Sequence, residues 1–451
     1  MDTSTTALLR RLNAKADRRA RWTEGPSTAF AGGEVRRFEL GNGLRLLTMV
    51  DRRAPVVAFH TWFRVGSRHE VPGKTGLAHL FEHLMFNETK RLPAGRFDTL
   101  LERAGAETNA ATWTDWTYYY ENVPRDQLAL VVRLEAQRMR ELVLRAGPVA
   151  SEKEVVANER RYRVDDDVEG LMSEVLWATA FTEHPYHHPT IGWMDDILGF
   201  TPADCRAFYK TWYAPNNATV VVVGDFELPR LLRMVQRGYG GYSAAKLPEE
   251  SLPVEPTQTA ERMVKLERPT PTDKLALGYK CPGLAHPDHA ALTVLSEALT
   301  GGRSSRFHRD LVTERELASE VAGFVSGFRD PGLWELGATA RAGVSASTLL
   351  DALDRGLDDL ASHPVSADER ERAVSRSELS FLRALETVGG RAETIGFHDT
   401  VLGDPAGGFT RQEAIRAVTV EQLRDVTRRY LLRARRTIVE VRSNLGAEAA
   451  A

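Results

Sequence analysis

The same helix-to-strand ending closes both halves of this sequence. Residues 208–225, FYKTWYAPNNATVVVVGD, and residues 426–443, VTRRYLLRARRTIVEVRS, each pass from a helical segment through a short turn into a β-branched strand. At 451 residues the chain is also too long for one ordinary hydrophobic core. We therefore expect two related lobes, because a repeated supersecondary unit indicates a repeated fold.

The expected lobes share an α+β architecture. Strand-like and helix-like segments mix without strict strand–helix–strand alternation, which favours mainly antiparallel sheets with helices packed on one face. Asn42-Gly43, between two alternating segments, predicts a hairpin turn. Several prolines and little apolar periodicity mark the middle of the chain as a linker. The predicted division is an N-terminal extension at 1–30, a first lobe at 31–240, the linker at 241–262 and a second, homologous lobe at 263–451.

The composition excludes several classes of protein. The chain is 42% hydrophobic and 27% charged and has no apolar run long enough for a bilayer, so we expect neither a disordered chain nor a membrane protein. A formal net charge of −3 gives no reason to expect a nucleic-acid partner. Cys205 and Cys281 lie far apart without metal-type spacing, which fits a reducing compartment. Since the N-terminus lacks the pattern of a secretory signal, we expect a cytoplasmic location.

Residues 76–86, GLAHLFEHLMF, set three polar side chains into an apolar segment. On a helix, His79 and His83 lie one turn apart and project from one face, so both imidazoles can reach one ion. Glu82 lies about 100° from His83, close enough to hold a water without ligating the ion. Zinc suits this set, because it accepts imidazole nitrogen and keeps one position for water in catalytic sites. The alternative is a buried helix whose histidines are satisfied by backbone or water. The order H-x-x-E-H favours the metal, because it is the inverzincin signature.

A third protein ligand has to come from another segment. In residues 152–160, EKEVVANER, four side chains fall at i, i+3, i+4 and i+7 and are expected to form one inward-facing stripe, Glu152, Val155, Val156 and Glu159. Two carboxylates on a buried stripe would need a cation. An amphipathic helix with salt-bridging acids at its margins explains the pattern equally well.

Residues 65–89, VGSRHEVPGKTGLAHLFEHLMFNET, closely resemble the signature of the pitrilysin/insulinase class of zinc metallopeptidases, in particular its mitochondrial-processing-peptidase-like branch. Five further segments look like family segments in the expected order: NAATWTDWTYYYENVP, EKEVVANERRYRVDDD, HPYHHPTIG, YAPNNATVVVVGD and GGRSSRF. The resemblance implies a zinc-dependent endopeptidase with one Zn²⁺ per chain, bound in the first lobe. Its implied site residues are the ligands His79, His83 and Glu159, the general base Glu82, which activates the zinc-bound water, and the supporting carboxylate Glu152.

The same resemblance implies where a peptide substrate would bind. Asn109, Ala110, Ala111 and Thr112 match an exposed edge strand to which the substrate of the family adds as an extra strand. Unfolded peptides, or leader and targeting peptides, are the implied substrates. Taken alone, Asn109 and Thr112 would be ordinary polar residues of a strand.

The sequence departs from the family in the second lobe. Self-sufficient members carry an Arg and a Tyr seven positions apart that bind substrate and stabilise the developing oxyanion. In LVTERELASEV, residues 311–321, these positions fall on Val312 and Ser319, and neither can fill the role. The resemblance therefore implies a zinc-bearing subunit that works with a homologous partner subunit, which would supply the Arg and Tyr. A homodimer or a single active chain stays open.

Two other functions are compatible with this fold. One is a leader-peptide maturation protease of a peptide biosynthetic pathway, and the other is a non-proteolytic structural subunit, like the core proteins of the respiratory cytochrome bc1 complex. The intact set of His79, Glu82, His83 and Glu159 argues against the structural subunit. A second metal site is not expected at EHPYHHP, because a loop flanked by prolines lacks a fixed ligand geometry for His184, His187 and His188.

Overall fold

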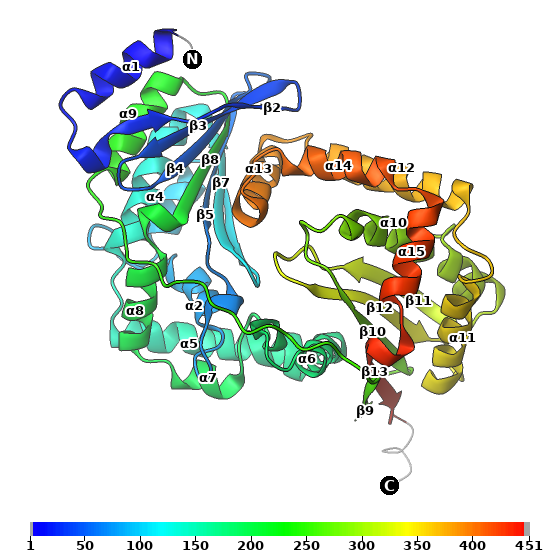
Figure 1. Ribbon diagram of the computed structural model, residues 1–451. Coiled ribbons are helices and arrows are strands. Elements are labelled where there is room, and N and C mark those ends of the chain that lie inside the picture. Colours follow the sequence, from blue (N-terminus) through cyan, green and yellow to red (C-terminus); the bar gives the residue numbers. More distant parts are fainter. Residues whose placement is uncertain (1–2, 446–451) are drawn as a thin grey trace. The chain divides into compact units, whose positions relative to one another are not determined.

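The computed structural model describes residues 3–445 and divides into two compact units (Figure 1). Unit 1 comprises the described residues up to Asn158, with Thr190–Ser251 and Ala384–Gly408, and unit 2 comprises Glu159–Pro189, Leu252–Arg383 and the described residues from Phe409 onward. Both units are discontinuous along the chain. Residues 159–189, which fall within the predicted first lobe at 31–240, belong to unit 2. Residues 384–408, which fall within the predicted second lobe at 263–451, belong to unit 1.

Unit 1 is built on a mainly antiparallel sheet. Its described strands are β1 (Trp22–Glu24), β2 (Thr28–Phe30), β3 (Gly33–Leu40), β4 (Arg45–Val50), β5 (Val56–Phe63), β6 (Glu107–Thr112), β7 (Thr117–Pro124) and β8 (Ala218–Gly224). They follow the order β1-β3-β4-β8-β5-β7-β6, with β2 beside β3. Only β4 and β8 pair in parallel among these strands. The predicted hairpin is confirmed, because β3 and β4 pair antiparallel and Gly43 between them has a φ of +88°.

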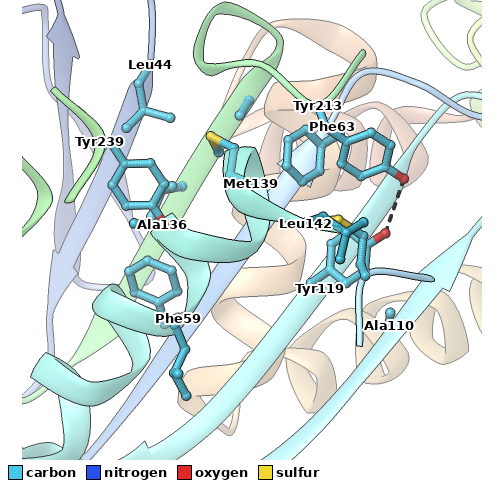
Figure 2. Packing of buried hydrophobic residues seen from close by; sticks show 14 of the residues in the cluster. Leu44, Phe59, Phe63, Ala110, Tyr119, Ala136, Met139, Leu142, Tyr213 and Tyr239 are labelled. Atoms are coloured by element: carbon cyan, nitrogen blue, oxygen red, sulfur yellow. Dashed lines mark hydrogen bonds between the residues drawn. The ribbon is translucent and has the colours of Figure 1, made fainter. Parts of the chain in front are cut away.

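Helices cover the sheet of unit 1, and most of them pack on one face. They are α1 (Thr3–Asn13), α2 (Leu77–Leu84), α3 (Arg96–Arg103), α4 (Leu128–Glu141), α5 (Ala146–Arg160), α7 (Met194–Gly199), α8 (Pro202–Trp212), α9 (Leu228–Tyr239) and α13 (Val388–Leu402). Figure 2 shows part of the core, where Phe63 of β5 lies beside Tyr119 and Tyr213, and Phe59 of the same strand lies nearer Ala136. The two tyrosine hydroxyls are 3.2 Å apart and share a hydrogen bond.

Helix α13 covers the opposite face of the same sheet (Figure 1). Alternate residues of β5 face it, and a Cβ on Gly396 of α13 would lie only 2.0 Å from Nε1 of the Trp62 indole. Most helices thus lie on one face of the sheet, as the sequence predicted, and α13 is the exception on the other face. The reason is that nearly every residue of β5 is buried, so this strand needs cover on both sides.

Unit 2 repeats this arrangement. Its described strands are β9 (Arg262–Arg268), β10 (Lys274–Cys281), β11 (Ala318–Val325), β12 (Gly332–Ala340) and β13 (Arg436–Ser443), and its helices are α6 (Val168–Ala180), α10 (Asp288–Thr300), α11 (Ala346–Asp359), α12 (Ala367–Ala384), α14 (Gly407–Ala417) and α15 (Val420–Tyr430). The strand order β9-β13-β10-β12-β11 matches β4-β8-β5-β7-β6 of unit 1, and β9–β13, like β4–β8, is a parallel pair.

The repeat extends to the helices. A helix, a 3-10 turn and a strand follow one another in α8–β8 and again in α15–β13, which confirms the repeated ending predicted from the sequence. Helix α6 packs on β10 and β13 as α13 packs on β5 and β8. Each of these two helices lies in the half of the sequence that belongs mainly to the other unit. Among the described helices, none combines the length and the apolar character that crossing a bilayer requires.

Candidate metal centre

The start of helix α2 is fixed by close backbone packing. Gly76 precedes the helix with a φ of +90°, and a Cβ there would lie 2.3 Å from the carbonyl oxygen of Ile191, so only glycine fits. The carboxylate of Glu70 accepts hydrogen bonds from the backbone N–H groups of Gly76 (2.8 Å) and Ala78 (2.6 Å). Backbone N–H groups in the first turn of a helix have no partner within the helix, and these hydrogen bonds satisfy two of them. Glu70 thus holds the helix that contains the H-x-x-E-H residues.

Helix α2 has one apolar face and one polar face. Its apolar residues are buried in the core of unit 1: Leu77, Ala78, Leu80, Phe81 and Leu84. The side chains of His79, Glu82 and His83 are half-buried. The rings of the two histidines have centroids 5.0 Å apart, which agrees with the predicted projection from one face.

The structure brings a third donor to these histidines. His79, His83 and Glu159 each offer one ligand atom, and the three atoms lie within 4.8 Å of one another. In the part of the chain that the structure describes, no other group of three His, Cys, Asp or Glu side chains meets this condition. Glu159 lies in the last turn of α5, and the preceding turns of this helix belong to unit 1. Two imidazole nitrogens and one carboxylate oxygen are a donor set that fits a catalytic zinc ion.

Glu152 lies beside His83, one of these three donors. Its Oε2 is 3.7 Å from Nδ1 of His83, and its Oε1 accepts a hydrogen bond of 2.9 Å from the side-chain amide of Asn87. The amide fixes the carboxylate, and the carboxylate can orient the imidazole. Glu159 in turn forms an ion pair of 3.0 Å with Arg163, one turn further along the chain.

The predicted inward-facing stripe on α5 is wrong at one position. Val156 is fully buried, but 46% of Val155 is exposed. Ala157 takes the second core position instead. The core-facing side of α5 is therefore rotated by about half a turn from Val155, because adjacent residues on a helix differ by roughly 100°.

Three tyrosines lie in the electrostatic field of Glu82. Burial raises the pKa of Tyr118, Tyr119 and Tyr213 well above the ordinary value, and the negative charge of Glu82 raises each of these pKa values further. The three phenols therefore stay protonated at neutral pH. The Tyr119 hydroxyl also donates to the carbonyl oxygen of Phe81 in α2, 3.1 Å away, which ties the metal helix to strand β7.

Strand β6 forms one edge of the sheet of unit 1. Among the described strands it pairs only with β7, so its outer backbone groups face no other strand. Asn109 is exposed, Ala111 is half-buried, and Ala110 and Thr112 are buried on the core side. The Asn109 side chain accepts a hydrogen bond from the N–H of Ala110. The four residues of the predicted substrate strand thus lie on an edge.

The residues that depart from the family pattern lie in unit 2. Val312 packs, partly buried, against the core of that unit, and the Ser319 hydroxyl donates to the carbonyl oxygen of Thr339, 3.3 Å away. His184 of the EHPYHHP loop lies 3.1 Å from Asp330 and accepts a hydrogen bond from the N–H of Tyr186. These interactions tie His184 to neighbouring residues of unit 2.

Sequence reasoning did not identify Glu70, Asn87 or the tyrosines near Glu82. Glu70 lies six residues before Gly76, and an acidic residue shortly before a glycine and a helix could have indicated a cap. Asn87 and Tyr118 reach the centre only through the tertiary fold, so no local pattern identifies them.

Comparison with known proteins decides the family. The family description "Insulinase (Peptidase family M16)" matches residues 45–193, and "Peptidase M16 inactive domain" matches residues 199–377. The chain belongs to peptidase family M16. The predicted membership of the pitrilysin/insulinase class is thereby confirmed.

Relatives of this M16 chain include named proteases. It is 32% identical to "Zinc protease PqqE" of Helicobacter pylori over 77% of this chain and 79% of that protein. It is 26% identical to "Mitochondrial-processing peptidase subunit beta" of Blastocladiella emersonii over 87% of this chain and 85% of that protein. The crystal structure of a protease from Helicobacter pylori matches with a TM-score of 0.86 at 30% identity, covering 91% of this chain and 99% of that one.

Proposed function

We propose that this M16 chain is a zinc-dependent endopeptidase that cleaves unfolded peptides or leader and targeting peptides. The observation that supports this most is the convergence of His79, His83 and Glu159 beside Glu82. These three side chains would hold the zinc ion, and Glu152 would orient His83. When bound, zinc supplies a Lewis acid that lowers the pKa of water and polarises a carbonyl group.

Glu82 is the proposed general base. It accepts a proton from the attacking water, whose oxygen forms the new bond to the scissile carbonyl carbon. The C–N bond then breaks, and Glu82 delivers the proton to the leaving amine. A half-buried carboxylate next to protonated tyrosines is screened less by solvent than an exposed one, which strengthens these proton transfers.

The edge of β6 is the proposed binding site for the peptide backbone. An extended peptide would pair with Asn109, Ala110, Ala111 and Thr112 through main-chain hydrogen bonds. Because side chains alternate along a strand, successive residues of the peptide would point to opposite faces of the sheet. Such binding selects unfolded segments, since a folded chain cannot offer a free strand.

The proposed enzyme works with a second, homologous chain. The Val312 side chain has no hydrogen-bond donor, and the Ser319 hydroxyl donates to the carbonyl oxygen of Thr339, so a partner would supply the Arg and the Tyr. We propose a heterodimer, with a homodimer as the alternative. Both cysteines are free and buried, which supports the proposed cytoplasmic location.

Mass spectrometry of peptide cleavage tests the proposal. The purified chain is stripped of metal, loaded with zinc and incubated with a mixture of unstructured peptides, with and without a candidate homologous partner. Glu82→Gln is expected to lower the rate by roughly 10²- to 10⁴-fold, as loss of a general base does. The matched control is Glu154→Gln, which changes an exposed carboxylate on α5. Cleavage that persists in Glu82→Gln, or no cleavage by the zinc-loaded pair, would contradict the proposal.

A further inference from the structure

Basic side chains are concentrated on two helical segments of unit 1 that lie side by side. One segment runs from α1 through a 3-10 turn at Arg18–Ala20, and the other is α9 (Figure 1). Residues 3–21 and 228–239 contain nine basic residues and a single acidic one, Asp17. The basic residues, which we call the basic patch, are Arg10, Arg11, Lys15, Arg18, Arg19, Arg21, Arg230, Arg233 and Arg237.

The two segments are in direct contact. The side-chain amide of Gln236 in α9 donates hydrogen bonds to the carbonyl oxygens of Leu12 (3.4 Å) and Ala20 (2.7 Å). A Cβ on Gly240, directly after α9, would lie 2.7 Å from the Cβ of Ala20. Arg233 lies three residues before Gln236 and is its neighbour on the surface of the helix. The cations of the two segments therefore belong to one continuous surface.

The arginines of α9 all face solvent. Arg230, Arg233 and Arg237 are spaced i, i+3 and i+7, which places them on one side of a helix. The opposite side of α9 is buried in the core of unit 1 through residues such as Leu232 and Val235. The other six residues of the basic patch are exposed as well. All nine cations are thus accessible to a partner.

Carboxylates do not neutralise the basic patch. In the part of the chain that the structure describes, none of the nine cations forms an ion pair. Arg19 donates instead to the hydroxyl of Ser243 at 2.7 Å, and Arg21 donates to the carbonyl oxygen of Ala16 at 3.2 Å. The formal net charge of the whole chain is −3, so the patch is a local excess of positive charge. Such a surface attracts an anionic partner.

The surroundings of the basic patch argue against a protein or a single-stranded nucleic acid as this partner. Protein interfaces have an apolar centre inside a polar rim, and single strands stack their bases on aromatic side chains. Among the described residues, none of the large hydrophobic or aromatic side chains that are exposed lies on these two segments. Binding at the patch would therefore depend on charge and hydrogen bonds alone.

A nucleic-acid duplex is also a poorer fit than a lipid surface. Proteins that recognise a duplex usually place a helix or a strand in one of its grooves. Both α1 and α9 instead pack along their length against unit 1, and α1 contributes Leu8 and Leu9 to the core. The cations are spread along the outer sides of these helices, where a planar array of phosphates can meet several of them at once.

We propose that the basic patch binds the surface of a membrane that contains anionic phospholipids. Arginine donates paired hydrogen bonds to phosphate oxygens, so the headgroup phosphates are the groups that the patch would contact. Because the leucines of α1 stay in the core, neither helix inserts among the acyl chains, and the attachment is reversible and sensitive to salt. This inference goes beyond the proposed function, because it involves neither the metal centre nor the edge of β6.

Flotation of the full, zinc-loaded chain with lipid vesicles tests the proposal. Vesicles of phosphatidylcholine alone are compared with vesicles that contain about one-third phosphatidylglycerol. We expect binding to the anionic vesicles at about 0.05 M salt, little binding to them at about 0.5 M salt, and none to phosphatidylcholine. In the triple variant Arg230→Gln, Arg233→Gln and Arg237→Gln, the affinity should fall by about 100-fold, since each arginine at an anionic surface contributes about fivefold.

A matched control removes three exposed arginines of unit 2. It carries Arg355→Gln, Arg372→Gln and Arg383→Gln, changes the net charge by the same amount and should bind the anionic vesicles like the wild type. A second variant on α1, Arg10→Gln with Arg11→Gln, should lose about 25-fold in affinity. Circular dichroism checks the fold of each variant, and the α1 variant tests the proposal even if the α9 variant does not fold.

Three results would overturn the proposal. The first is equal binding of the wild type to neutral and anionic vesicles. The second is an affinity that the α9 and α1 substitutions leave unchanged, or that the unit 2 control loses to the same extent. The third is a DNA duplex that binds more tightly than the anionic vesicles and that the α9 variant no longer binds, which would assign the basic patch to nucleic acid instead.

Discussion

Arg45 on β4 and Asp399 on α13 form an ion pair of 2.8 Å, although 354 positions separate them in the sequence. The Asp399 side chain is fully buried and also accepts a hydrogen bond of 3.1 Å from the Thr219 hydroxyl on β8. A second ion pair, between Arg391 of α13 and Asp51, lies near the other end of the helix. These contacts hold α13, a helix from the second half of the sequence, against the sheet of unit 1. The same sheet supports the helix that contains His79 and His83.

Removing Asp399 should destabilise unit 1. Asp399→Ala leaves Arg45 without its buried partner, and breaking such a pair costs about 3 kcal/mol in the free energy of unfolding. Urea denaturation followed by circular dichroism measures this loss. The matched control is Glu386→Ala, an exposed acid just before α13, which should change stability by no more than about 0.5 kcal/mol. Equal stability of the two variants would contradict the structural role of the pair.

Gly396 should tolerate no larger side chain. The Cβ of Gly396→Ala would meet the buried indole of Trp62, so the helix or the ring has to move, at a cost of about 1–3 kcal/mol. Thermal unfolding checks this. Gly199→Ala, in α7 with open space around the new Cβ, is the control and should be neutral or slightly stabilising. A neutral Gly396→Ala would show that α13 does not pack tightly on β5.

Glu152 should strengthen zinc binding without being required for it. Loss of a group that orients a metal-ligating histidine typically weakens metal affinity by about 10- to 100-fold, and Glu152→Gln should show this. Competition with a chromogenic zinc chelator measures the affinity. Glu154→Gln, two residues away and exposed, should bind zinc like the wild type. An unchanged affinity in Glu152→Gln would exclude the orienting role.

Glu255 should make unit 2 sensitive to acid. Burial by itself raises the pKa of Glu255. Hydrogen bonds from the backbone N–H groups of Glu183, His184 and Thr182, together with the charge of Lys280, outweigh this effect and lower the pKa to about 2. Because this pKa lies below the unfolded value of roughly 4.3, the carboxylate contributes stability above about pH 4.3 and loses it as the pH falls toward 2.

The stability difference between wild type and Glu255→Gln measures that contribution. It is expected to be constant between about pH 7 and pH 5 and to shrink between about pH 4.3 and pH 3. Urea denaturation at each pH gives the two free energies. A difference that stays the same down to pH 3 would show that Glu255 has no depressed pKa.

Local patterns in the sequence predict the parts of this fold that depend on local geometry. The spacing of His79 and His83 places both on one face of a helix, and Asn42-Gly43 specifies a hairpin, because in each case neighbouring residues determine the conformation. The repeated ending at 208–225 and 426–443 indicates the repeated topology for the same reason.

Features that depend on distant segments could not be predicted in this way. The sequence gives no local sign that α13 packs on β5, since Gly396 and Trp62 lie in different halves of the chain. The cavity lined by His60 of β5 and Glu393 of α13 depends on distant segments in the same way. The i+3 spacing predicts that Val155 is buried, but the core of unit 1 contains Val156 and Ala157 instead.

Zinc content after exhaustive dialysis tests the central claim most directly, because it asks whether His79, His83 and Glu159 bind one ion together. Elemental analysis should find about one zinc per chain in the wild type, in Glu82→Gln and in Glu154→Gln, as a catalytic site with three protein ligands predicts. His83→Ala and Glu159→Gln should retain almost none while keeping the circular dichroism spectrum of the wild type. Zinc content that is the same in Glu159→Gln and the wild type would contradict the assignment of Glu159 as a ligand, and zinc retained by His83→Ala as well would contradict the metal centre itself.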